Sequence, residues 1–410
     1  MIVNKTQVLI LFLLTSVSLR AQQPSEIKPS VKFGGYIEWQ TLYDTYKSVD
    51  TRDGDLYYYP LAKLLDKNGA DINKKGQLEM MALHSRLSAK FEGIEAFGAK
   101  TTGMIEADFF GTSQTNIRML RLRQAFIQLQ WSNTGVIMGN TWHPIILPEL
   151  TPSTVAFGAA APYHSLNRSP QLRLTYSLGS TKFIGAAIVN GYHRSTGPYD
   201  AQRYSARPEL VAQIQAGNPS FFFWGASAGY KWLTPRLITD SLTKTNQTIG
   251  SYLLHVFARL KTQPITIKYE TVYGENLSHL NMIGGYGKIT NTGITDNDYE
   301  YSNLRTLSTW IDFETKIESY LFGLFAGYAQ NMGSSEKYTA IKDYTRSGDL
   351  DCIYRISPRI TTMSGPVTLG LEYMYSAAAY GTKFNDNGKP TETATPTVNH
   401  RITLSARYSF

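Results

Sequence analysis

Apolar and polar side chains alternate along most of this chain, most clearly at its C-terminal end. The last thirteen residues read VNHRITLSARYSF, and apolar or aromatic side chains occupy every second position from Ile402 to Phe410. A period of two places these side chains on one face of a β-strand and the arginines and hydroxyls on the other. A final aromatic residue on the apolar face of an arginine-bearing strand is typical of the closing strand of an outer-membrane β-barrel.

The same alternation recurs in about sixteen segments, separated by turn-forming residues. The predicted strands are 31–45, 78–91, 97–110, 118–131, 135–142, 171–178, 182–190, 209–216, 221–232, 248–261, 265–274, 305–317, 321–331, 352–363, 367–380 and 399–410. Short connections rich in Gly, Pro, Asn and Ser alternate with long polar ones. The pattern predicts an all-β protein, a single transmembrane antiparallel β-barrel with short periplasmic turns and long extracellular loops.

The N-terminus predicts export. Residues 8–17 form an apolar run after Lys5, and a run of about ten residues is too short for a helix that crosses a bilayer. We therefore expect a signal peptide at 1–21, a short periplasmic segment at 22–30 and the barrel at 31–410, in the outer membrane of a Gram-negative bacterium. An uncleaved anchor is the alternative.

Composition narrows the function classes. Aromatic residues make up 12%, with 27 Tyr, yet the mean hydropathy is only −0.24, as expected where every second residue faces water. A single cysteine, Cys352, excludes a disulfide framework, and no metal-binding motif is present, so no cofactor or metal is expected. The net charge of +8 is spread among the strands rather than clustered, and nucleic acid is not an expected partner.

Basic residues dominate the predicted water-facing side. The candidate pore-lining residues are Arg86, Arg121, Arg123, Arg173, Arg259, Lys268, Arg355, Arg359 and Arg401, together with Lys90 and Arg407. The opposing inward acids are Glu38, Glu270, Asp312, Glu314 and Glu372. A basic excess in a narrow pore concentrates anions, and the guanidinium fork suits carboxylates. The alternative is that the arginines pair with inward acids. The phase of strand 118–131 changes near Arg123 and Gln124, which predicts a β-bulge there.

The third long connection, 143–170, differs from the others. It carries five prolines, many small apolar residues and few charges. A loop packed inside a barrel can be apolar, so we expect this one to fold inward and narrow the channel. Its candidate polar contacts are His143, Glu149, His164 and Arg168. A loop that caps a subunit interface is the alternative.

Three motifs support a family resemblance. The run LRLRQAFIQLQW…GVIMGNTWHPI at 120–145, the opening FGGYIEWQTLYDT at 33–45 and the downstream Gly54-Asp55 pair resemble the DcaP-like trimeric porin family. The resemblance implies a sixteen-stranded barrel, a homotrimer in outer-membrane lipid and passage of small, often anionic organic solutes. Arg121 and Arg123 match its basic strand, and Trp142 its signature tryptophan. The chain departs from the pattern before Val31, where no coiled-coil heptad is present.

Other functions need features that we do not find in the sequence. A barrel hydrolase needs a nucleophile beside a histidine, and His84 and His255, predicted to face inward, have no obvious one. We therefore expect that the protein is not an enzyme. A structural or adhesive barrel is the remaining alternative to a porin. If the protein is a porin, both a general diffusion channel and a channel that binds its solute are compatible with the sequence.

Overall fold

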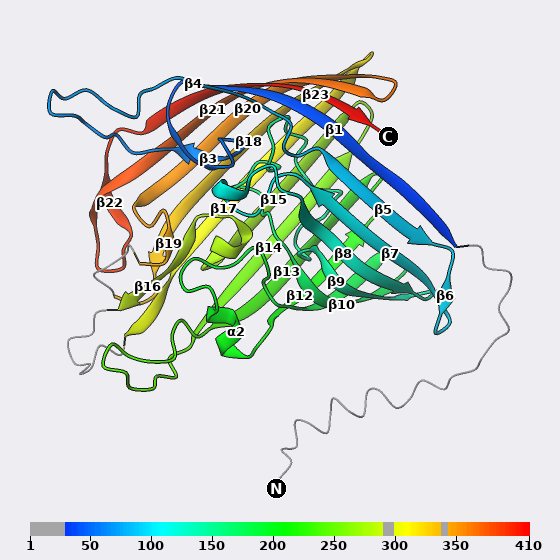
Figure 1. The fold of residues 1–410 in the computed structure, drawn as a ribbon, viewed down its shortest axis with the longest axis horizontal. Helices are drawn as coiled ribbons and strands as arrows, with labels where there is room; N and C mark the ends of the chain where they lie inside the picture. The colour runs from blue at the N-terminus through cyan, green and yellow to red at the C-terminus, as the bar shows by residue number, and fades with distance from the viewer. Residues whose placement is uncertain (1–28, 290–298, 338–342) are drawn as a thin grey trace, which may run out of the picture.

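Sixteen strands close into one antiparallel β-barrel in the computed structural model, which describes residues 29–289, 299–337 and 343–410 (Figure 1). The strands of the wall are β1 (Ser30–Asp44), β4 (Gln77–Met81) continued by β5 (Arg86–Glu92), β7 (Ala99–Asp108), β8 (Arg121–Gln130), β9 (Thr134–Trp142), β10 (Arg168–Leu178), β11 (Thr181–Ile188), β12 (Glu209–Gly217), β13 (Phe222–Leu233), β14 (Ile249–Lys261), β15 (Ile265–Glu275), β17 (Glu300–Ile317), β18 (Tyr320–Ser334), β20 (Leu350–Ser364), β21 (Val367–Phe384) and β23 (Thr397–Ser409). All sixteen predicted strands are present. The predicted signal peptide lies outside the described residues.

The first and last strands close the barrel. β1 pairs antiparallel with β23, with Tyr36 opposite Ser409, and with β4 and β5 on its other side. The N–H of Gly35 donates to the carbonyl oxygen of Phe410 at 3.1 Å. The C-terminal segment is therefore the closing strand, as its alternation predicts, and it removes both free sheet edges.

The bulge predicted in β8 is also present. Glu106 of β7 pairs with Gln124, whereas Ala107 pairs with Leu122, so Arg123 is the extra residue. Both Arg123 and Gln124 are buried on the inner side. The bulge lets β8 direct two arginines inward without turning Ala125, Ile127 and Leu129 away from the outer face.

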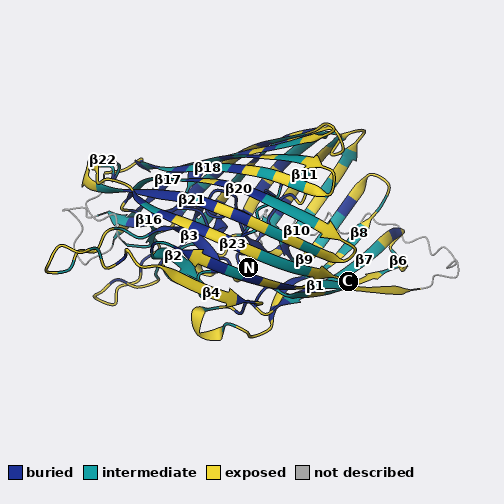
Figure 2. Ribbon diagram, turned by 90° about the horizontal axis from the view of Figure 1, so that it is seen from above, coloured by how far each residue is buried: buried dark blue, intermediate teal, exposed yellow. Residues whose placement is uncertain are grey.

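The two faces of the wall differ as the sequence predicts. Leu172, Leu174, Tyr176 and Leu178 of β10 are all exposed on the outside, and so are Ile402 and Leu404 of β23. Exposed residues alternate with less accessible ones over 367–374 of β21 and 399–404 of β23, as the banding in Figure 2 shows. This outer apolar surface is what a barrel presents to lipid.

The connections at the two ends of the barrel differ in length. The short-turn rim lies near β6 (Glu95–Ala96), and the long-loop rim carries β16 (Gly284–Ile289), β19 (Thr345–Arg346), β22 (Pro390–Thr393) and α2 (Ala201–Ser205) (Figure 1). The remaining short elements are β2 (Ser48–Thr51), β3 (Leu56–Pro60), η1 (Gln114–Asn116) and η2 (Leu277–Leu280). Among the described residues, no helix is long and apolar enough to cross a membrane.

Three loops fill part of the lumen, where the sequence predicts only one. They are L1 (45–76), L3 (143–167) and the described part of L6 (276–289), which follow β1, β9 and β15. All five residues of β3 in L1 are buried, and Tyr380 of β21 donates to the Pro60 carbonyl at 2.8 Å. The long polar connection expected after the first strand is therefore only partly confirmed: 63–76 is mostly exposed, whereas the LYYYP run at 56–60 packs against the inner wall.

Candidate pore constriction and lumen

Loop L3 lies inside the barrel and is bonded to distant strands. The N–H of Ser153 donates to Asp312 Oδ2 at 3.1 Å, and the Lys268 ammonium donates to the Thr151 carbonyl at 3.0 Å. On the opposite side, Gln40 Nε2 donates to the Val155 carbonyl at 2.9 Å. Because these partners lie on β17, β15 and β1, the loop spans the space between them.

Both ends of L3 are fastened by histidines. His143 Nε2 lies 3.3 Å from Glu209 Oε1, and His164 Nδ1 lies 3.1 Å from Glu270 Oε2. Arg168, a predicted loop contact, instead begins β10. Glu149 is half-buried and forms no ion pair with any described residue.

The predicted basic residues of β8 lie on the inner wall but are neutralised by acids of β7. Arg121 makes two hydrogen bonds to Asp108, at 2.7 and 3.0 Å. Arg123 bridges Glu106 at 2.7 Å and Asp108 at 2.8 Å. Both arginines and Asp108 are at least nine-tenths buried, so these are fork-type charged hydrogen bonds shielded from water.

The opposite wall shows the same pairing. Arg359 reaches across β18 to Asp312, with hydrogen bonds of 2.6 and 3.0 Å. Gly323 of β18 makes room for it, since a Cβ there would lie 2.3 Å from Arg359 Cζ. Arg355 donates to Glu372 at 2.5 Å. Elsewhere on the wall, Arg401 binds Asp44 at 2.7 and 2.9 Å.

The sequence left open whether the inward arginines are free to attract anions or are paired with acids. For five of them the structure shows pairing. Arg121, Arg123, Arg355, Arg359 and Arg401 are all paired. The sequence reading missed Asp44, Glu106, Asp108 and Glu209 as inward acids. Glu106 and Asp108 were detectable, because they are two residues apart on the strand that precedes the arginine-rich one.

Three predicted basic residues remain without an ion pair among the described residues: Arg168, Arg173 and Arg259. Arg168 lies over the ring of Trp142, with Cζ 4.5 Å from the centroid, a cation–π contact that leaves its charge in place. Arg173 donates to the carbonyl of Trp142 and to Gln171. Arg259 donates to the Pro219 carbonyl at 3.2 Å.

A cavity of about 550 Å³ lies between L3 and the wall. L3 contributes 148, 151–159 and 166, and Thr361, Thr368 and Gly370 extend the lining toward the short-turn rim. The basic side chains that line it are Arg86, Arg123, Arg168, Lys268 and Arg407. Glu38 is the only carboxylate of this lining among the described residues. Arg123, Lys268 and Arg407 each form an ion pair, with Glu106, Glu314 and Glu38 respectively.

A buried acid of L1 lies next to this cavity. Asp55 Oδ1 is 3.5 Å from His84 Nε2, and His84 Nδ1 is 3.6 Å from Glu38 Oε2. Burial raises the pKa of Asp55 to about 8, although Arg401 opposes the shift. Asp55 is thus neutral at pH 7.

One expectation about histidines is wrong. His255 faces inward as predicted, but it does have a hydroxyl beside it: Ser227 Oγ lies 3.1 Å from His255 Nδ1. His255 Nε2 lies 3.6 Å from Glu270. Gln213 Nε2 donates to Ser227 Oγ at 2.9 Å and to the Pro144 carbonyl of L3 at 3.0 Å. His255 and Glu270 are 1% exposed, so this chain of contacts fastens the loop rather than facing a substrate.

Comparison with solved structures identifies the fold. The chain is similar to the outer membrane channel DcaP of Acinetobacter baumannii, with a TM-score of 0.70 and 17% identity over 95% of this chain and 100% of that one. It also resembles the anion-selective porin from Comamonas acidovorans (TM-score 0.57, 8% identity, 93% and 100% covered) and the trimer form of OmpT from Vibrio cholerae (0.56, 9%, 93% and 99%). No family model and no curated protein matches the chain.

The fold is therefore that of a Gram-negative outer-membrane porin. Of the structures named here, DcaP has the highest TM-score, and the likeness to the DcaP fold that the sequence motifs predict is confirmed.

Proposed function

We propose that this protein is a porin that lets small solutes diffuse across the outer membrane and prefers anions such as organic carboxylates. The observation that carries the proposal is the cavity beneath L3, which is lined by five basic side chains and one carboxylate. An excess of positive charge between low-dielectric walls attracts anions and repels cations.

The placement of the acids strengthens this reading. On the β7–β8 side, Arg86, Arg121, Arg123 and Arg168 gather around two acids, Glu106 and Asp108, so four cations less two anions leave a charge of +2. Asp108 is fully buried, whereas Arg86, Arg123 and Arg168 line the cavity. Neither Glu106 nor Asp108 lines the cavity, so guanidinium groups border it on this side. Arg86, Arg123 and Arg168 are our candidates for the residues that set selectivity.

The filled lumen favours a channel that binds its solute over a wide general pore. L1, L3 and L6 all pack inside the barrel, and the Leu166 N–H donates to the Leu280 carbonyl at 2.8 Å, which joins L3 to L6. With L3 as the constriction, a solute of the right size would contact both the loop and the arginine-bearing wall.

We also propose that the barrel assembles as a homotrimer. One similar structure is described as a trimer form. Cross-linking of the purified protein in detergent, followed by denaturing electrophoresis without heating, should give a band of three chains. A single-chain band at every cross-linker concentration would contradict the trimer and leave the pore untouched.

Planar bilayer recordings test the pore itself. Under a KCl gradient, the reversal potential should indicate that chloride is more permeant than potassium. Small carboxylates added at rising concentration should reduce the chloride current in a saturable way. A cation-selective reversal potential would refute the anion preference, and a current that carboxylates leave unchanged would indicate a general diffusion pore.

A further inference from the structure

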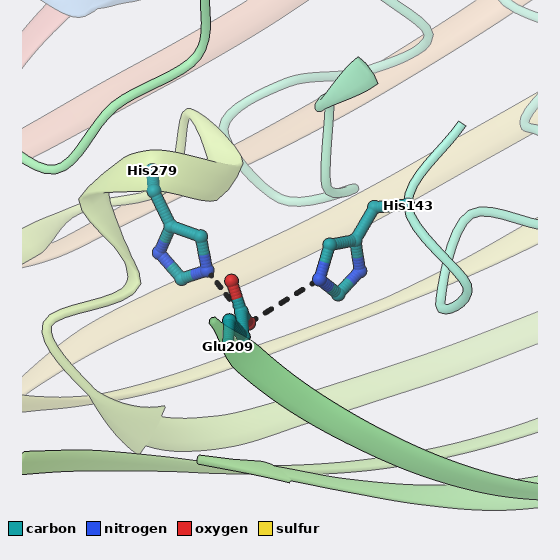
Figure 3. Close-up of side chains that lie close together, drawn as sticks. All are labelled: His143, Glu209 and His279. Atoms are coloured by element: carbon teal, nitrogen blue, oxygen red, sulfur yellow. Dashed lines mark hydrogen bonds and ion pairs between the residues drawn. The ribbon is translucent and has the colours of Figure 1, made fainter. Parts of the chain in front are cut away.

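We propose that His143, Glu209 and His279 bind one divalent transition-metal ion, zinc foremost, and that the ion fastens L3 and L6 to the wall. The three side chains converge from different parts of the fold: the first residue of L3, the first residue of β12 and helix η2 of L6 (Figure 3). Among the described residues this is the one group of three or more histidine, cysteine and acidic side chains whose ligand atoms all lie within 4.8 Å of one another.

The distances suit a metal ion. Glu209 Oε1 is 3.3 Å from His143 Nε2 and 3.2 Å from His279 Nε2. In a tetrahedral zinc site with bonds of about 2.0–2.1 Å, adjacent ligand atoms are about 3.3–3.4 Å apart. Two imidazole nitrogens and one carboxylate oxygen are a ligand set that zinc and its first-row neighbours accept.

The site is closed and its carboxylate is oriented. His143, Glu209 and His279 are each at most 1% exposed. Asn190 Nδ2 donates to Glu209 Oε2 at 3.1 Å, which leaves Oε1 directed between the two histidines. A hydrogen bond to the second oxygen of a ligating carboxylate is the usual support for such a ligand.

A second trio of the same residue types lies in the barrel, but its ligand atoms do not all lie close together. His164, His255 and Glu270 are the same residue types, equally buried, and also lie where L3 meets the wall. His164 and His255 both approach Glu270, but the ligand atoms of this trio do not all fall within 4.8 Å. It is therefore the matched control, since the same residue types fasten the loop there through hydrogen bonds.

Lys231 is in contact with one of the proposed ligands. Its Nζ lies 2.5 Å from both His279 Nδ1 and the Asn276 carbonyl. A positive charge this close opposes a bound cation. Removal of the charge should therefore strengthen metal binding, whereas a purely hydrogen-bonded cluster would gain no affinity for metal.

A small cavity lies beside the proposed site. A cavity of about 240 Å³ is lined by Val189, Asn190, Gln202 and Leu233 among others. Asn190 belongs both to this cavity and to the hydrogen bond with Glu209, so an ion that enters the cavity is one side chain away from the carboxylate.

The test uses the purified full-length protein in detergent, stripped with EDTA. We expect calorimetry to show one Zn²⁺ bound per chain, and Co²⁺ to give the intense visible absorption of a tetrahedral site. His143→Gln and His279→Gln should each weaken binding by about tenfold or more, and His255→Gln should leave it unchanged. Absence of Zn²⁺ binding by the unaltered protein, or equal loss in His255→Gln, would overturn the proposal.

Two further measurements guard against misfolding of the variants. Circular dichroism and heat-modified migration on gels report whether each variant keeps its barrel. Lys231→Met leaves all three ligands in place, and we expect it to raise the affinity for Zn²⁺ several-fold; an unchanged or lower affinity in a folded Lys231→Met barrel would count against the site. Neither test depends on conduction, so the metal site and the proposed pore can fail separately.

Discussion

The backbone N–H of Val155, in the middle of L3, donates a 2.5 Å hydrogen bond to Glu372 Oε2 on β21, 217 residues further along the chain. The other oxygen of the same carboxylate accepts a 2.5 Å hydrogen bond from Arg355. Glu372 is 1% exposed. One buried carboxylate thus links the loop to the wall and neutralises a wall arginine.

Glu372→Gln should loosen L3. The amide keeps the size of the side chain but removes the charge that both contacts use, and it leaves Arg355 without its buried partner. Loss of one member of a buried ion pair costs about 3–5 kcal/mol of the free energy of unfolding. Urea unfolding in detergent measures this cost, and single-channel recordings should show a noisier current.

The control is Glu392→Gln. Glu392 pairs with Lys383 at 2.7 Å, but both side chains are more than half exposed, so the expected change is below about 1 kcal/mol. Equal stability of the Glu372 and Glu392 variants would show that Glu372 does not anchor the loop.

Arg168→Gln should weaken anion preference. Its guanidinium lines the cavity over Trp142 and has no ion pair within the part of the chain that the structure describes. Because its charge is not neutralised locally, its removal should lower the attraction for a passing anion by roughly 1 kcal/mol, a few-fold in the chloride-to-potassium permeability ratio. Reversal potentials in a KCl gradient measure the ratio.

Arg203→Gln provides the comparison for this experiment. Arg203 lies in α2 with its side chain 80% exposed, and it does not line the 550 Å³ cavity beneath L3. It removes the same charge from the same chain, and the permeability ratio should stay near that of the unaltered protein. A ratio that falls equally in both variants would indicate an effect of net charge rather than of the cavity.

The strands and their faces were predictable because alternation is a local signal. A period of two assigns each side chain to a face without knowledge of any neighbouring strand, and a phase change of one residue locates the bulge at Arg123. The ion pairs were not predictable in the same way. Whether Arg121 meets Asp108 depends on the register between β7 and β8, which alternation leaves open.

The inward folding of L1 and L6 was not predicted from the sequence, for a different reason. A segment surrounded by protein on both faces does not alternate, so its burial has to be inferred from composition. The run LYYYP at 56–60 carries that signal within an otherwise polar stretch. The trio His143, Glu209 and His279 combines three regions that only the closed barrel brings together.

Asp55 should make selectivity depend on pH. Its pKa, raised to about 8 by burial, keeps it neutral at pH 7, and it becomes anionic as the pH rises through about 8. The new negative charge next to Glu38 and the cavity should lower the chloride-to-potassium permeability ratio between pH 7 and pH 9. The free energy of unfolding should also fall with rising pH. The folded state binds the Asp55 proton more tightly than the unfolded state, so stability decreases as the pH rises from about 4 to about 8.

Asp55→Asn isolates this effect. The amide cannot ionise, so the part of the pH dependence due to Asp55 should disappear, and the variant should keep the pH 7 ratio at pH 9. The groups around Asp55 include His84, Glu38, Arg121, Arg401 and Asp108. If the variant shows the same fall in the ratio as the unaltered protein, another of these groups is responsible.

Substitutions on the outer face of the barrel can test whether that face contacts lipid or water. Leu404 lies in the middle of β23 with its side chain outward, between Thr41 and Leu371 on the neighbouring strands. If this face contacts the hydrocarbon core, Leu404→Arg should lower the free energy of unfolding from lipid vesicles by about 2–4 kcal/mol. Leu242→Arg places the same charge on a long-loop side chain that is 79% exposed, where water solvates it, and should change stability by less than about 0.5 kcal/mol. Chemical unfolding of both variants in the same vesicles measures the difference, and equal stabilities would mean that the Leu404 face does not lie in the membrane.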